Sequence, residues 1–139
     1  MPTTNSSSEV VRSFFAAFGS GDLDGIVAVF HPDAHITAVR PGARGEGQLY
    51  GSYSGAAGVR EFVGTLGRLF ETQAFSVDHV VGLGEVAFAS GRFTHRVRAT
   101  DRVFRSDWAL KCVIRDGAIF EYHFYEDSAA YVEASAEAR

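Results

Sequence analysis

Apolar residues recur at intervals of three and four near the start of the chain, which is the period of a helix with one buried side. Ser6 and Glu9 have the spacing of a capping box, and Gly19 can end the helix because glycine tolerates a left-handed backbone. We therefore predict a helix from about residues 6–8 to residue 19. Its apolar positions are Val10, Val11, Phe14, Phe15 and Phe18.

The next apolar positions predict a shorter helix that Asp22 can cap. The His31-Pro32 step should close it, because the residue before a proline avoids the helical region. A short strand over residues 34–39, a long loop over 40–57 and a third helix over 58–70 are expected to follow. A loop this long is more often functional or mobile than idle. The apolar positions of the short helix are Leu23, Ile26, Val27 and Phe30.

From residue 72 onward the pattern is typical of long antiparallel strands. The expected strands are 74–82, 85–98, 103–115 and 118–126. Asp116-Gly117 is a strong signal for a tight hairpin between the last two, and Asp127 can cap a terminal helix. Helices followed by a run of meandering strands indicate an α+β fold, with the helices gathered on one face of a sheet.

Composition limits the class of protein further. With 139 residues, 46% of them hydrophobic, the chain fits a flexible N-terminus over residues 1–6 and a single domain over 7–139. A net charge of −4 argues against a nucleic-acid partner. No apolar run approaches the roughly 20 residues of a membrane span, and no signal peptide is visible, so we expect a cytoplasmic protein without a membrane partner. The single cysteine, Cys112, is expected to be an inert core thiol.

The Asp116-Gly117 turn predicts which side chains share a face of the sheet. In an unbroken two-residue hairpin, residues equally distant from the turn lie opposite each other. A connection of even length around residues 100–101 would add Phe93 and His95 to the same face. Phe120, Tyr122 and Phe124 would then form an apolar row on the other face. The predicted pairs are Ile114–Ile119, Cys112–Glu121, Leu110–His123, Trp108–Tyr125 and Ser106–Asp127.

The first of these faces combines an apolar floor with a few polar groups, which is typical of a small-molecule site. His123 is its candidate general base. Two structural alternatives stay open, namely a hydrogen-bonded core histidine at His123 and a helix cap at Asp127. His31 and His35 have no third partner of the kind a metal ion needs, so we expect no metal site.

The order of these elements resembles the NTF2-like superfamily, and its SnoaL-like branch most closely. The resemblance covers about residues 10–134. It is carried by Gly51-x-Tyr53-x-Gly55-x-x-Gly58-Val59-x-x-Phe62, by Arg115-Asp-Gly-Ala-Ile119 and by Tyr125-Glu-Asp127. It implies a conical α+β barrel, in which a curved antiparallel sheet wraps around the N-terminal helices and leaves an internal cavity. It also implies a homodimer formed through the outer sheet face, where the apolar row would need cover.

The same resemblance implies a lyase or isomerase of the cyclase-like kind that acts on a small hydrophobic carbonyl compound without a cofactor. His123 would be the base, oriented by Tyr125 or Asp127, and His95 or Tyr53 would donate a hydrogen bond to the enolate. Two alternatives are a non-catalytic protein that binds a hydrophobic ligand, and an interaction module whose cavity its own phenylalanines fill. The expected ligand-binding residues are Phe15, Phe18, Tyr53, Phe62, Phe93, His95, Trp108 and Leu110.

Overall fold

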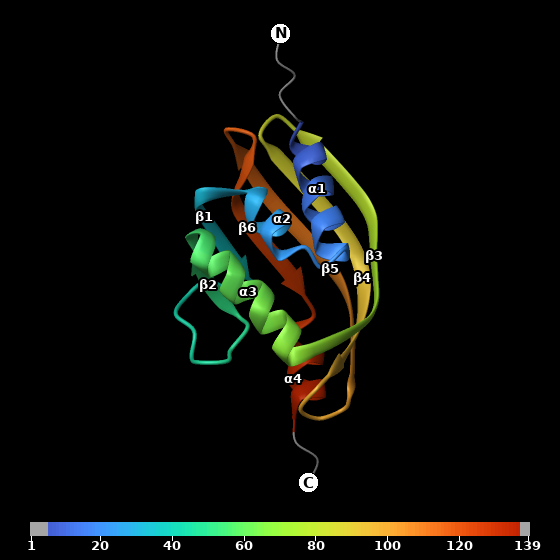
Figure 1. The fold of residues 1–139 in the computed structure, drawn as a ribbon. Helices are drawn as coiled ribbons and strands as arrows, with labels where there is room; N and C mark the ends of the chain where they lie inside the picture. Colours follow the sequence, from blue (N-terminus) through green and yellow to red (C-terminus); the bar gives the residue numbers. More distant parts are fainter. Residues whose placement is uncertain (1–5, 137–139) are drawn as a thin grey trace.

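A computed structural model describes residues 6–136 of the chain. Its helices gather on one face of a single curved sheet (Figure 1). The six strands lie in the order β2-β1-β6-β5-β4-β3. The elements are α1 (Ser7–Gly19), α2 (Leu23–Ala28), β1 (Phe30–Ala38), β2 (Gly51–Ser54), α3 (Gly55–Leu69), β3 (Phe70–Leu83), β4 (Val86–Val97), β5 (Val103–Arg115), β6 (Ala118–Glu126) and α4 (Ser128–Ser135).

The α+β prediction is confirmed, with one difference in the sheet. β1 runs parallel to β6, whereas every other neighbouring pair is antiparallel, so the sheet is mixed and not wholly antiparallel. Of the predicted flexible N-terminus, residues 1–5 lie outside the described residues. No helix within residues 6–136 is both long and apolar enough to cross a membrane.

The predicted caps begin the first two helices. Ser6 Oγ accepts the N–H of Glu9 at 3.3 Å, and Asp22 Oδ1 accepts the N–H of Gly25 at 2.9 Å. The second helix is shorter than predicted, because Phe30 belongs to β1, where it pairs with Ile119 of β6. The predicted loop over 40–57 is also shorter, since β2 and the start of α3 occupy its last seven positions.

The core lies between the helices and the inner face of the sheet. On β5 every second residue is buried, from Phe104 to Ile114, and β4 alternates in the same way. Cys112 is fully buried in this core, and burial raises the pKa of its thiol well above the usual range, which makes it a poor nucleophile. The β4–β5 register is shifted by two residues from the predicted one, so Phe93 and His95 still point inward.

A β-bulge in β6 overturns the predicted register of the last hairpin. Ile114 pairs with Ile119 as predicted, but Val113 pairs with Glu121, which leaves Phe120 as an extra residue on β6. Because side chains alternate along a strand, one extra residue turns every later side chain to the other face. Beyond the bulge Cys112 pairs with Tyr122, Leu110 with Phe124 and Trp108 with Glu126.

Candidate functional site

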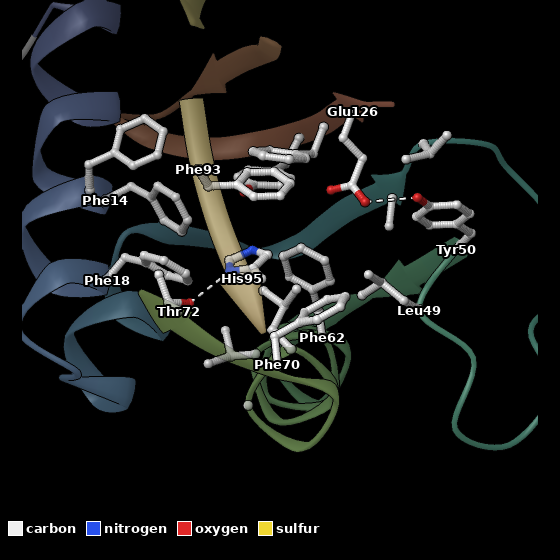
Figure 2. Close-up of a pocket in the computed structure, with 18 residues that line it drawn as sticks. Phe14, Phe18, Leu49, Tyr50, Phe62, Phe70, Thr72, Phe93, His95 and Glu126 are labelled. Atoms are coloured by element: carbon white, nitrogen blue, oxygen red, sulfur yellow. Dashed lines mark hydrogen bonds between the residues drawn. The ribbon is translucent and has the colours of Figure 1, made fainter. Parts of the chain in front are cut away.

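A cavity of about 200 Å³ lies between α1, α3, the inner face of the sheet and the loop that precedes β2 (Figure 2). It reaches solvent beside Gly67 and Thr72, both of which are exposed. A mostly aromatic wall with four polar side chains has the composition of a small-molecule site. The aromatic residues are Phe14, Phe15, Phe18, Phe62, Phe70, Phe93, Tyr122 and Phe124, and the polar ones are Tyr50, Thr72, His95 and Glu126.

Glu126 supplies the carboxyl group of the cavity. It is the last residue of β6 and points inward because the bulge at Phe120 has turned the strand over. Its Oε2 accepts the O–H of Tyr50 at 2.8 Å (Figure 2). Burial raises the pKa of Glu126 to about 7; the hydrogen bond from Tyr50 opposes this rise and the negative charge of Asp127 adds to it. Near neutral pH this carboxyl can therefore both accept and return a proton.

Tyr50 stays protonated under the same conditions. Burial raises the pKa of its hydroxyl far above the ordinary value, and the neighbouring carboxylate of Glu126 raises it further. The hydroxyl is therefore a donor to Glu126 throughout the range in which Glu126 titrates.

His95 supplies the nitrogen group of the cavity. Its ring is stacked between Phe70 and Phe93, with centroid distances of 4.7 and 4.1 Å. Burial lowers its pKa to about 4, so the imidazole is neutral at pH 7. Nδ1 lies 3.1 Å from Thr72 Oγ1, and Figure 2 shows the second ring nitrogen pointing away from Thr72 into the cavity. When Thr72 donates to Nδ1, the proton is on Nε2, which can then donate to a bound molecule.

The predicted ligand-binding residues divide into two groups. Phe15, Phe18, Phe62, Phe93 and His95 line the cavity. Tyr53, Trp108 and Leu110 are buried behind its wall instead. The hydroxyl of Tyr53 is already engaged, because it donates to the carbonyl of Leu49 at 2.6 Å. Trp108 stacks against Phe75 and Phe124, with centroids 5.3 and 5.4 Å away.

The prediction that His123 and Tyr125 lie on the cavity face of the sheet is wrong. The bulge turns both to the outer face of the sheet, away from the cavity, and Tyr125 is 44% exposed there. His123 is hydrogen-bonded at both ring nitrogens, to the Val39 carbonyl and to the Tyr125 hydroxyl, each at 3.0 Å. Neither residue lines the cavity, so a catalytic role for either of them stays a prediction.

The same inversion removes the apolar row expected on the outer face. Tyr122 and Phe124 line the cavity, and of the three predicted members only Phe120 stays outside. Its ring lies under the Arg115 guanidinium, 3.9 Å from the centroid. The homodimer therefore remains a prediction, but the outer face lacks the apolar row from which it was predicted.

Asp127 is the N-cap of α4, which agrees with the alternative left open for it. Its Oδ1 accepts the N–H of Ala130 at 3.0 Å, and its own N–H donates to Ser106 Oγ at 2.9 Å. We expect Asp127→Ala to lower the free energy of unfolding by about 1 kcal/mol, whereas Asp127→Asn, which keeps an accepting oxygen, should change it little. Urea denaturation measures both values. Equal losses in the two variants would contradict the capping role.

Sequence reasoning missed Glu126, Tyr50 and Thr72. Glu126 was placed on the wrong face by an unbroken hairpin register, and Tyr50 lies in a loop without periodicity. One signal was available: Ile119 and Phe120 are both apolar, and the alternation resumes through Tyr122 and Phe124 out of phase with Ile119. Such a break in phase is typical of a bulge. Nowhere in residues 6–136 do three or more His, Cys, Asp or Glu side chains gather in a way that could hold a metal ion.

A curved sheet that encloses a cavity against its helices defines the NTF2-like class of α+β folds, and solved structures agree. An NTF2-like protein from Burkholderia xenovorans LB400 is 27% identical, with a TM-score of 0.79 over 96% of this chain and 100% of that one. One from Burkholderia thailandensis E264 is 21% identical, with a TM-score of 0.82 over 95% and 98%. A candidate polyketide cyclase from Pseudomonas putida KT2440 is 17% identical, with a TM-score of 0.72 over 95% and 99%.

The sequence itself gives the family. The profile described as SnoaL-like domain matches residues 11–122, which is most of the chain. The chain therefore belongs to the SnoaL-like family. No curated protein matches it at a significant level.

Proposed function

We propose that the protein is a cofactor-independent lyase or isomerase of the cyclase-like kind, which uses Glu126 as a general base on a small hydrophobic carbonyl compound. The observation that carries this proposal is a single carboxyl group in an aromatic cavity, with its pKa raised to about 7 by burial. A base is most effective when its pKa lies near the working pH. Enzymes commonly obtain such a value by burying a carboxylate.

The proposed chemistry begins with removal of a proton from the carbon next to the substrate carbonyl. Glu126 takes the proton, and the electron pair of the C–H bond moves onto the carbonyl oxygen to form an enolate. The Nε2–H of His95 donates to that oxygen, and the apolar wall strengthens this hydrogen bond by excluding water. A neutral imidazole suits this role because it can stabilise the enolate without protonating it fully.

The enolate can then react in two ways. If Glu126 returns the proton to a different carbon, the product is an isomer of the substrate. If the enolate carbon attacks a second carbonyl in the same molecule, a carbon–carbon bond closes a ring and Glu126 returns its proton to the new alkoxide oxygen. In both cases Tyr50 holds the carboxyl group in place through its hydrogen bond. Neither route consumes an oxidant or a reductant.

The alternative function is a binding protein with the same cavity and no chemistry. The aromatic lining favours this alternative, because most of the wall offers contact area and no reactive group. The candidate polyketide cyclase from Pseudomonas putida supports the fold alone at its level of identity, so it does not separate the two functions. The two functions differ in whether the carboxyl group of Glu126 acts as a base.

The direct test is proton exchange, which needs no knowledge of the final product. Purified protein is mixed in deuterated buffer with a panel of hydrophobic ketones and diketones, and loss of the α-proton signal is followed by NMR. We expect exchange to accelerate as the pH rises through about 7 and then to level off, because Glu126 acts as a base only when ionised. Heat-unfolded protein is the control for buffer catalysis.

The same panel is measured by thermal unfolding, because a ligand that binds only the folded protein raises its stability. Stabilisation without exchange would favour the binding protein. Neither stabilisation nor exchange with any member of the panel would overturn both functions.

A further inference from the structure

Val39 has a backbone conformation that its side chain disfavours. Its φ is 65°, in the left-handed region where β-branched residues are rare. The N–H of Arg40 donates to the carbonyl of Ala38 at 2.8 Å, which closes a three-residue γ-turn around Val39. A γ-turn with a left-handed central residue is uncommon and strained. Among the described residues, Asp101 and Asp116 also have positive φ without being glycine, but aspartate is a usual turn residue.

Two hydrogen bonds from β6 hold Val39 in this turn. Its N–H donates to the carbonyl of Phe124 at 2.8 Å, and its carbonyl oxygen lies 3.0 Å from Nε2 of His123. A carbonyl can only accept, so Nε2 carries a proton, and in a neutral imidazole Nδ1 is then the acceptor. The hydroxyl of Tyr125 donates to that nitrogen at 3.0 Å, and the two rings are stacked with centroids 4.0 Å apart. The outer face of the sheet thus fixes both the tautomer and the orientation of His123.

The turn lies directly beside Tyr50. Ala38 and Gly51 form the last pair between β1 and β2, so Val39 and Tyr50 occupy the next positions of the two segments. Both side chains line the cavity. From there the hydroxyl of Tyr50 reaches Glu126 (Figure 2). A short path therefore runs from His123 on the outer face, through the adjoining positions of Val39 and Tyr50, to the buried carboxyl group.

We propose that His123 is a positioning residue, whose hydrogen bond to Val39 holds the strained turn that places the Tyr50 hydroxyl on Glu126. The proposal rests on the proposed function only where it takes Glu126 to be the base. Without the donor at His123, Val39 is expected to relax toward an extended backbone, and Tyr50 then moves away from the carboxyl group.

Charged and titratable groups surround both His123 and Glu126. His123 faces Lys111 across the β5–β6 pair, and Glu121 lies on the same face of its own strand. His35 of β1 and Tyr125 complete that surface. Glu126 is close to Tyr50 and to the carboxylate of Asp127. Substituting His123 leaves both neighbours of Glu126 chemically unchanged, so a response at Glu126 must come from a change in position.

The test is to measure the pKa of Glu126 directly, by ¹³C NMR of its carboxyl carbon over a pH series. No substrate is needed, so the result is independent of whether the proposed function is correct. Tyr50→Phe removes the hydrogen bond that lowers this pKa, and its upward shift sets the scale. His123→Leu should shift the pKa in the same direction and by a similar amount. His123→Gln, whose amide can donate to Val39, should stay near the wild-type value.

His35→Leu is the matched control, because it makes the same substitution at another outer-face histidine on the strand beside His123. It should leave the pKa of Glu126 unchanged. The Val39→Gly background completes the design, since glycine adopts a positive φ without strain and needs no support. There, His123→Leu should have no effect on Glu126, and the two substitutions should be strongly non-additive.

An unchanged pKa in His123→Leu would overturn the proposal, and so would a shift that persists undiminished in the Val39→Gly background. If His123→Leu does not fold, His123→Phe takes its place, because it keeps a flat ring beside Tyr125 and removes the donor to Val39. An upward shift in that variant supports the proposal, and an unchanged pKa overturns it.

Discussion

Glu126→Gln is expected to reduce protein-catalysed exchange of a ketone α-proton by about 10²- to 10⁴-fold, the usual contribution of a general base. The amide has nearly the same shape as the carboxyl group, and it can still accept the hydrogen bond of Tyr50, but it cannot take up a proton. The shape of the cavity and its aromatic wall should be retained. The deuterium-exchange assay measures the rate, and thermal unfolding with the same ketone measures binding.

Glu121→Gln provides the matched control. Glu121 is the same residue type on the same strand, five positions earlier, and its exposed side chain lies on the outer face of the sheet. Its substitution should leave exchange at the wild-type rate. If Glu126→Gln keeps a rate within a few-fold of the wild type, Glu126 is not the base. If the variant binds the ketone but no longer exchanges its proton, binding and chemistry are separated within one cavity.

Phe104→Ala should produce the largest loss of stability among single truncations of the core, about 3–5 kcal/mol. Phe104 is 1% exposed and packs against the rings of Phe93 and Tyr131, with centroids 5.0 and 5.5 Å away. The substitution removes a buried ring and leaves a void that this well-packed part of the sheet cannot close. For a domain of this size the loss corresponds to a fall in melting temperature of roughly 10–15 °C, which scanning calorimetry resolves.

Phe88→Ala makes the same chemical change on the outer face of the neighbouring strand, where Phe88 is 51% exposed. It should cost less than about 1 kcal/mol, because little apolar surface returns to water and no void forms. Equal losses in the two variants would mean that the outer face is covered in solution, and would return the homodimer to consideration.

The elements of this chain could be predicted from sequence because their signals are local. Ser6 and Asp22 cap the first two helices where their spacing indicated, and Asp116-Gly117 makes the last hairpin. Phe93 and His95 were also placed on the correct face, because a register error of two residues preserves the alternation of side chains.

The functional site could not be predicted in the same way, because it depends on a single backbone irregularity. The bulge at Phe120 lies on β6 between β1 and β5, so the pairing around it involves three strands at once. A register error of one residue at the bulge made His123 the expected base in place of Glu126. Tyr50 was missed for a related reason, since its contact with Glu126 joins positions far apart in the chain.

The extra residue in β6 also shows what keeps the reactive group in place. Deleting Phe120 would remove the bulge and leave every pair from Val113–Glu121 to Trp108–Glu126 as it is, so Glu126 would still point inward. Pairing Phe120 with Val113 instead would shift β6 by one residue, turn His123 and Tyr125 inward and Glu126 outward, and expose the rings of Tyr122 and Phe124. These two aromatic rings, which line the cavity, therefore also act as the lock that selects a carboxyl group over an imidazole as its reactive group.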